Sequence, residues 1–338
     1  MKGLLPLEHT QKLLSNASPI FSYKEGYDIN VFQSEGRDTL KRLLGIHLIE
    51  DKYKKKDIEI QYDQYADDLN CREIKFTIES ENDVLVPCYL LLPKSNPRAP
   101  LVIALHGHST GVHICLGREK YPVDSNTIAN QECDFAKQAV NLGYAVLALE
   151  HRGFGERGGD EKGAKCSEIA FRSMMLGRTL IGERVWDAKV ALDAAIDNFG
   201  ELFDSEKIAC LGYSGGGTVG TYLSAIDERI NATIITSAIS TVSRSIGAMP
   251  HCACNYVPSI ARYFDMGNIC QLIAPRALTI ISGNEDPIFP IEGAIECVNV
   301  AKSAYSKYKA EEKLIHITAI GVHKFYPHEA FDALRKLI

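Results

Sequence analysis

The chain has 338 residues, 46% of them hydrophobic, which is enough to bury one substantial core in a single domain with an N-terminal extension. Its formal net charge is −6, and its lysine run at 54–56 is short and followed by acidic residues, which argues against nucleic acid as a partner. Its ten cysteines are scattered rather than grouped as a disulfide framework, which favours a reducing, cytoplasmic setting.

The N-terminal part is mostly polar. Pro6 and Glu8 stand where a signal peptide needs an apolar core, and no apolar run approaches the ~20 residues that cross a bilayer, so no membrane partner is expected. Residues 1–70 are expected to form an extension packed on the core of the main domain, with helix-like patches over 39–48 and 53–68.

The core elements are expected from residue 71 onward. Alternating apolar and polar residues over 71–79, a turn at 81–83 and a second run over 84–92 predict an antiparallel edge to a sheet. The other expected elements are, in chain order, a buried strand at 100–105, an irregular pocket wall at 111–130, a helix at 133–142, a strand at 144–149, a glycine-rich loop at 153–163, a helical region at 166–199, and strands at 232–236, 277–283 and 313–319.

The strongest local signal is the segment Gly212-Tyr213-Ser214-Gly215-Gly216. It follows the apolar run 208–211 and precedes the helix-compatible segment 218–225, so a strand, a sharp turn and a helix are predicted with Ser214 at the turn. The flanking glycines allow a strained turn and a close approach of strand and helix. Ser214 is therefore the candidate nucleophile; the alternative is a glycine-rich turn with an incidental serine.

A nucleophilic serine needs a base and a group that orients the base. The expected strand at 277–283 leads to Asp286, and the one at 313–319 leads to His323. The order Ser, Asp, His, with each residue after its own strand, is the order found in α/β-hydrolases. We predict that His323 acts as general base and then acid, and that Asp286 fixes its tautomer, with Glu285 as the substitute acid.

Other histidines compete for the role of the base. His316 lies within its strand and His328 opens the final helix, so the loop position favours His323. His106 is expected to hydrogen-bond within the loop after strand 100–105. The backbone amide of Gly215, at the start of the helix, is the first expected oxyanion donor, and the amide of His108 is the second.

On these residues the chain resembles the α/β-hydrolase superfamily, and more narrowly the acetyl xylan esterases and dienelactone hydrolase-like bacterial esterases, over residues 71–338. The matching features are His106-Gly107-His108, residues 143–146 leading to 151–157, the Ser214 turn, Ala274-Pro275-Arg276 and His323. The resemblance implies a mostly parallel central sheet flanked by helices. Related cephalosporin and xylan deacetylases carry a tyrosine, an Arg-Gly-Gln-Gly motif and a glutamine where this chain has His108, Arg152-Gly153-Phe154-Gly155 and Gly215.

Residues 240–268 form an insertion between two expected strands, and in this fold such an insertion commonly serves as a cap. Its aromatic residues Tyr256, Tyr263 and Phe264 are expected to narrow an acyl pocket; the alternative is that these rings pack into the core or a subunit interface. The candidate substrate-binding residues are His108, Arg152 and Tyr256. For Arg152 a loop anchor paired with Glu150 or Glu156 is the favoured explanation.

No cofactor is expected, because the chain has no phosphate loop and no dinucleotide fingerprint. No metal is expected either: the segment His251-Cys252-Ala253-Cys254 has two cysteines separated by one residue and no second pair elsewhere, which does not match the usual zinc spacing. The sequence leaves a homo-oligomer open.

These features predict a serine hydrolase that cleaves carboxylic esters, with an acetylated sugar as the leading substrate. The first alternative is a prolyl oligopeptidase-like peptidase, which shares the core and the triad but has a propeller domain that this N-terminal segment is too short to form. The second is a non-catalytic binding protein on the same fold, which would be marked by a missing nucleophile or base.

Overall fold

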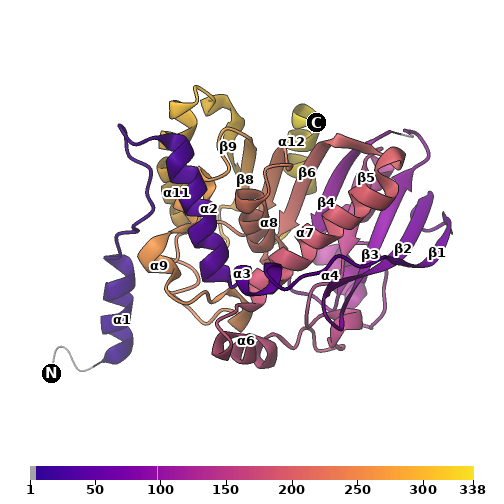
Figure 1. Cartoon of the computed structure of the whole chain (residues 1–338), viewed down its shortest axis with the longest axis horizontal. Helices are drawn as coiled ribbons and strands as arrows, with labels where there is room; N and C mark the ends of the chain where they lie inside the picture. The colour runs from indigo at the N-terminus through magenta and orange to yellow at the C-terminus, as the bar shows by residue number, and fades with distance from the viewer. Residues whose placement is uncertain (1–4, 97) are drawn as a thin grey trace.

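The computed structural model describes residues 5–96 and 98–338, so residues 1–4, which belong to the N-terminal argument above, lie outside the described residues. The described chain is built around a nine-stranded sheet in the order β1-β2-β3-β5-β4-β6-β7-β8-β9 (Figure 1). The strands are β1 Glu59–Ala66, β2 Cys71–Glu81, β3 Val84–Pro93, β4 Pro100–Leu105, β5 Ala145–Leu149, β6 Asp204–Tyr213, β7 Ala232–Thr236, β8 Ala277–Gly283 and β9 Leu314–Ala319. The six strands β5, β4, β6, β7, β8 and β9 run parallel to one another. The strands β1, β2 and β3 form an antiparallel edge next to β5. This is the expected α/β-hydrolase fold.

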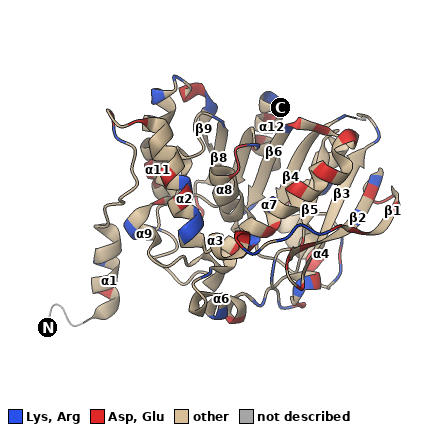
Figure 2. Ribbon diagram, in the orientation of Figure 1, with Lys and Arg blue, Asp and Glu red and all other residues tan. Residues whose placement is uncertain are grey.

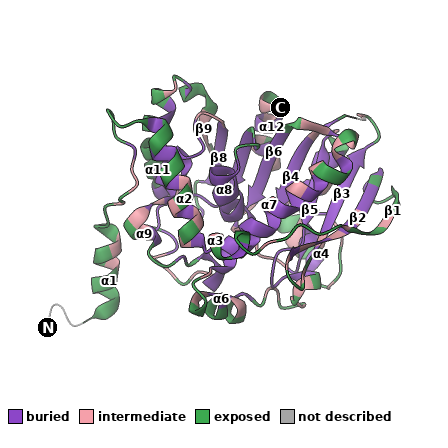
Figure 3. Cartoon of the chain, in the orientation of Figure 1, coloured by how far each residue is buried: buried purple, intermediate pink, exposed green. Residues whose placement is uncertain are grey.

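Helices cover both faces of the sheet, which explains why its central strands are apolar throughout. One face packs against α2 Ile29–Leu44, α7 Leu180–Phe199, α8 Gly215–Ile226 and α11 Ile291–Lys307 (Figure 1). The other packs against α5 Phe135–Asn141 and α12 Pro327–Leu337. All residues of β5 and β7 are buried, and Figure 3 shows the central strands as a buried layer of the molecule, whereas the edge strand β1 is mostly exposed.

Two predicted helical regions differ from the structure. The stretch 53–68 contains strand β1, which pairs antiparallel with β2, so the helix expectation there is wrong. The region 166–199 is two helices, α6 Cys166–Met175 and α7, which separate at Gly177, where φ is 75°. The hydroxyl of Thr179 then caps α7 by accepting a hydrogen bond from the amide of Gly182 at 3.0 Å. In both cases a contact or a local turn decides the structure where helical propensity alone does not.

The segment 111–130, expected to be irregular, contains a 3₁₀ turn, η1 Val112–Ile114, and most of α4 Asp124–Gln131. The short helix α3 His47–Glu50 follows α2, close to the predicted helical patch at 39–48. Helix α1 Pro6–Ser15 buries none of its residues and stands at the opposite end of the molecule from β1 (Figures 1 and 3).

The insertion at 240–268 contains the 3₁₀ turn η4 Ala253–Asn255, helix α9 Ile260–Tyr263 and the start of α10 Met266–Gln271. Its aromatic residues separate in space. Phe264 is fully buried in the core and stacks on Phe21 with ring centroids 5.1 Å apart. The expectation that Phe264 narrows an acyl pocket is therefore wrong, because its ring fills the space between α9 and the N-terminal segment.

Charged residues of both signs are interspersed over the helices and the β1–β2 edge, as Figure 2 shows. Among the described helices none is long and apolar enough to cross a membrane.

Candidate active site

Ser214 occupies the sharp turn between β6 and α8. Its backbone has φ 52° and ψ −124°, a strained conformation for a residue with a side chain. The surrounding glycines are required by close packing: a Cβ on Gly216 would lie 2.0 Å from the carbonyl oxygen of Leu105, and one on Gly212 would lie 2.7 Å from the carbonyl oxygen of Gly216. The amide of Ser214 donates to the carbonyl of Thr236 at 3.0 Å, which ties the turn to β7.

The structure brings Ser214, His323 and Asp286 together in one hydrogen-bonded chain. The Nε2 atom of His323 lies 2.8 Å from the Ser214 hydroxyl, and its Nδ1 atom lies 2.8 Å from Oδ2 of Asp286. The second carboxylate oxygen of Asp286 accepts the backbone amides of Ile288 and Phe289 at 2.8 and 3.0 Å. Such a chain can transfer the serine proton to the imidazole while the carboxylate stabilises the resulting charge.

The imidazole of His323 contacts two aromatic rings. The centroid of the Tyr213 ring lies 5.5 Å from the centroid of the imidazole. The ring of Phe289 is nearly parallel to the imidazole, with centroids 5.9 Å apart. These contacts restrict the rotation of the imidazole, so its two nitrogens stay aligned with the serine and the carboxylate.

The competing groups lie elsewhere. Glu285 is exposed, whereas the side chain of Asp286 is fully buried. His316 contacts the hydroxyl of Ser282 at 3.1 Å, and burial lowers the pKa of His316. His328 is largely exposed beside Asp332.

His106 has its expected place within the loop that follows β4. Its Nδ1 atom lies 2.9 Å from the carbonyl of Gly107, and its Nε2 atom accepts the amide of His151 at 3.4 Å. Both ring nitrogens of His106 are therefore engaged near this loop, and neither of these bonds involves the Ser214 hydroxyl.

The loop after β4 lies directly against the serine turn. A Cβ on Gly107 would lie 3.1 Å from the Cβ of Ser214, and one on Gly215 would lie 2.5 Å from Nδ1 of His108. Within the described residues no hydrogen bond from the backbone amide of Gly215 or of His108 is found, so both remain able to donate. An oxyanion at the serine is the acceptor that such free amides can serve.

The serine opens into a pocket of about 340 Å³. Part of its wall is formed by the serine turn, His323 and their neighbours. The rest comes from the insertion and from the loop after β8. The lining residues are His108, Gln131, Tyr213, Ser214, Gly215, Met249, Pro250, His251, Cys252, Asn255, Ile288, Phe289 and His323. Of the three expected substrate-binding residues, His108 lines this pocket. Tyr256 does not; it lies on the outer side of the insertion, where its hydroxyl accepts the amide of His251 at 3.3 Å.

Sequence reasoning missed His251, Gln131 and Asn255 as pocket residues. His251 contacts the hydroxyl of Ser245 at 3.1 Å and packs edge-on against Phe289, and burial lowers the pKa of its imidazole. The Oδ1 atom of Asn255 is buried and has no hydrogen-bond partner in the described chain. His251 and Asn255 lie within the insertion that was expected to cap the pocket, and Gln131 ends α4, directly after the segment 111–130 that was expected to form a pocket wall.

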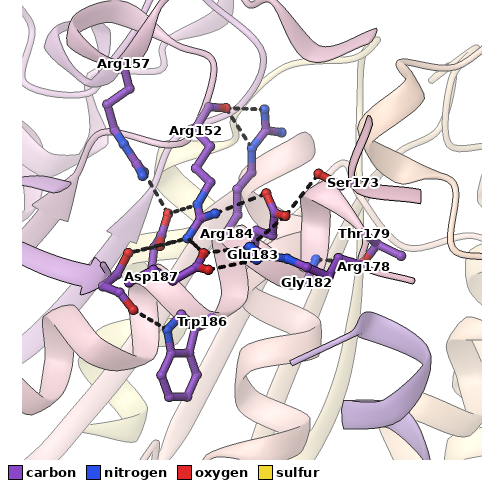
Figure 4. A network of polar contacts seen from close by, with 12 residues as sticks. Arg152, Arg157, Ser173, Arg178, Thr179, Gly182, Glu183, Arg184, Trp186 and Asp187 are labelled. Carbon is purple, nitrogen blue, oxygen red and sulfur yellow. Dashed lines mark hydrogen bonds and ion pairs between the residues drawn. The ribbon is translucent and has the colours of Figure 1, made fainter. Parts of the chain in front are cut away.

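Arg152 is a buried structural anchor and does not line the pocket. Its guanidinium pairs with Asp187 at 2.8 Å and Glu183 at 3.2 Å (Figure 4), and also with Glu81 at 2.7 Å. The expectation that Glu150 or Glu156 pairs with it is therefore wrong. Burial alone would raise the pKa of Asp187, but the charges of Arg152 and Arg157 more than offset this and hold it well below its usual range. With its donors engaged in this network, Arg152 is not available for a substrate contact.

No protein-family model matches the chain. It is 27% identical over 256 residues to a Bacillus subtilis (strain 168) protein named "Putative hydrolase YtaP", covering 74% of this chain and 83% of the relative. It superposes with a TM-score of 0.74 and 14% identity on a "putative acetyl xylan esterase" from Bacteroides fragilis NCTC 9343, covering 93% of this chain and 82% of that one. A CE15 glucuronoyl esterase from Teredinibacter turnerae T7901 gives a TM-score of 0.67 at 16% identity, covering 96% and 90%. These similarities agree with the α/β-hydrolase fold described above.

Proposed function

We propose that this protein is a serine esterase that hydrolyses carboxylic esters through an acyl-enzyme intermediate. The observation that supports the proposal best is the hydrogen-bonded chain from the Ser214 hydroxyl through His323 to the buried carboxylate of Asp286, with 2.8 Å at both steps. Serine by itself is a weak nucleophile at neutral pH, and this arrangement supplies the base that activates it.

In the proposed reaction the Ser214 oxygen attacks the ester carbonyl while His323 takes the serine proton. The amides of Gly215 and His108 donate to the oxyanion of the tetrahedral intermediate. His323 then protonates the leaving alcohol, and an acyl group remains on Ser214. A water molecule activated by the same imidazole releases the acid and restores the serine.

The size of the pocket, about 340 Å³, supports small or medium esters. Acetylated carbohydrates are the leading class, since one structural neighbour is named a putative acetyl xylan esterase; a second, named a glucuronoyl esterase, supports carbohydrate esters more broadly. The described residues that line the pocket carry no Lys, Arg, Asp or Glu, which favours a neutral substrate over a charged one.

The test is turnover of p-nitrophenyl esters, acetylated xylose and a dipeptide amide by the wild type and by Ser214→Ala. The wild type should hydrolyse the esters and leave the amide intact, and a fluorophosphonate should label the wild type alone. Circular dichroism should be the same for both proteins, because only one hydroxyl is removed. Wild-type turnover by Ser214→Ala would reject the assignment, and preferential cleavage of the amide would indicate a peptidase.

A further inference from the structure

Four side chains that commonly bind metals lie together beside the catalytic pocket: His108, Cys166, Cys252 and Cys254. Their ligand atoms, one imidazole nitrogen and three sulfurs, all lie within 4.8 Å of one another. The Nε2 atom of His108 is 3.1 Å from the sulfur of Cys254 and 3.9 Å from that of Cys166. The four residues come from the loop after β4, the first turn of α6 and the insertion around η4, so the fold itself assembles the cluster.

The spacing and the residue types fit a tetrahedral zinc site. With Zn–S bonds of about 2.3 Å and a Zn–N bond of about 2.0 Å, tetrahedral geometry separates the ligand atoms by roughly 3.5 to 3.8 Å. The observed separations bracket these values. Three cysteines and one histidine are a familiar ligand set of structural zinc sites, and all three thiols are free here rather than joined in a disulfide.

The charge around the cluster supports bound thiolates. Arg184 of α7 is 3% exposed, and its Nη2 atom donates to the sulfur of Cys166 at 3.2 Å and to the carbonyl of Arg152 at 2.6 Å (Figure 4 shows the latter contact). Within the described chain no carboxylate pairs with this guanidinium, whose Cζ atom lies over the ring of Phe154, 4.7 Å from its centroid. A buried cation needs a compensating anion. Three thiolates around a divalent ion carry one net negative charge, which Arg184 balances.

We propose that His108, Cys166, Cys252 and Cys254 bind one zinc ion in a closed, structural site. Four protein ligands leave no open coordination position, so the ion supports the fold instead of activating water. This proposal replaces the expectation of no metal, which considered Cys252 and Cys254 without a second pair. The missing ligands lie far away along the chain: His108 is 146 residues from Cys254.

The position of the ion gives it a role in the proposed esterase activity. The imidazole of His108 rests against Gly215, and Cys252 lines the catalytic pocket. Zinc would therefore fasten the insertion to α6 and to the loop that carries the second proposed oxyanion amide. This role depends on the proposed function, but binding of the ion does not.

The test is the zinc content of the full chain purified under reducing conditions, measured by elemental analysis. The wild type should hold one zinc per chain, and Cys166→Ser and Cys254→Ser should lose most of it. Cys133→Ser is the matched control: Cys133 is also buried, but it is not one of the four clustered residues and its thiol donates to the carbonyl of Thr127 at 3.6 Å, so zinc should be retained.

A second readout covers the case in which the cysteine variants do not fold. Wild-type protein reconstituted with Co²⁺ should show the visible absorption of tetrahedral cobalt and sulfur-to-metal charge-transfer bands. The proposal would be overturned if the wild type held no zinc after reconstitution, or if Cys166→Ser held as much zinc as the wild type. It would also be overturned by cobalt spectra without thiolate bands, or by a disulfide among the three cysteines. A zinc-loaded protein without esterase activity would reject the proposed function and leave the metal site standing.

Discussion

Replacing Asp286 by asparagine while leaving its neighbour Glu285 intact tests the proposed catalytic chain at its buried end. In the wild type, Oδ1 of Asp286 accepts two backbone amides and Oδ2 faces Nδ1 of His323 at 2.8 Å. An asparagine must turn its oxygen toward the two amides, because its NH₂ group cannot accept from them. That NH₂ group then faces Nδ1 of His323 and forces this nitrogen to act as an acceptor.

The consequence is the wrong tautomer. The imidazole proton moves to Nε2, which then points a hydrogen at the Ser214 hydroxyl and can no longer take its proton. The equivalent change in another Ser-His-Asp enzyme lowers kcat by ~10⁴-fold, about 5.5 kcal/mol in activation free energy, and we expect a loss of that order here. Glu285→Gln, at an exposed position, should leave kcat roughly unchanged.

The assay is kcat and kcat/KM for p-nitrophenyl acetate, with the melting temperature of each variant as a check on folding. The asparagine keeps the two amide contacts, so both variants should remain folded. If Glu285→Gln proved the more damaging change, or if Asp286→Asn lost less than about tenfold, the reasoning on the tautomer would be refuted.

Further predictions concern packing, acid stability and substrate size. Gly216→Ala places a Cβ 2.0 Å from a backbone oxygen of β4 and should lower the free energy of unfolding in urea by about 3 kcal/mol. Gly200→Ala is the control, because its Cβ would have its nearest atom at 3.9 Å and should have little effect. Equal stabilities of the two variants would contradict the packing argument. Because the folded-state pKa of Asp187 lies well below its unfolded value of about 4, its stabilisation is present above that pH and is lost as the pH falls. The stability gap between the wild type and Asp187→Asn should therefore shrink in acid, and a gap independent of pH would argue against it. Acetyl and butyryl esters should exceed octanoyl esters in kcat/KM by about tenfold, and a preference for octanoyl esters would reject the small acyl pocket.

Much of the fold was predictable because local sequence determines it. The strand at 100–105 and the strand at 232–236 have the expected bounds, since a short apolar run between turns leaves few alternatives. The turn at Ser214 was also visible, because its glycines are needed by contacts between adjacent elements. The chain order then placed Asp286 and His323 after neighbouring strands, and the sheet brings them to one edge.

The remainder depends on contacts between distant segments. Strand β1 forms because β2 offers it a partner, which no helical pattern within 53–68 reveals. The partners of Arg152 come from β2 and α7 rather than from its own loop, and Phe264 is buried because an N-terminal ring stacks on it. The cluster of three cysteines and His108 is invisible to sequence spacing for the same reason.

The most direct test of the central claim is to look for the acyl-enzyme itself. The protein would be mixed with an acetyl ester, quenched with acid during turnover, digested and analysed by mass spectrometry. We expect the mass of one acetyl group on the peptide that carries Ser214, and its absence in Ser214→Ala. Rapid ester turnover with no acylated Ser214, or with the acetyl group on a different residue, would contradict the proposed mechanism.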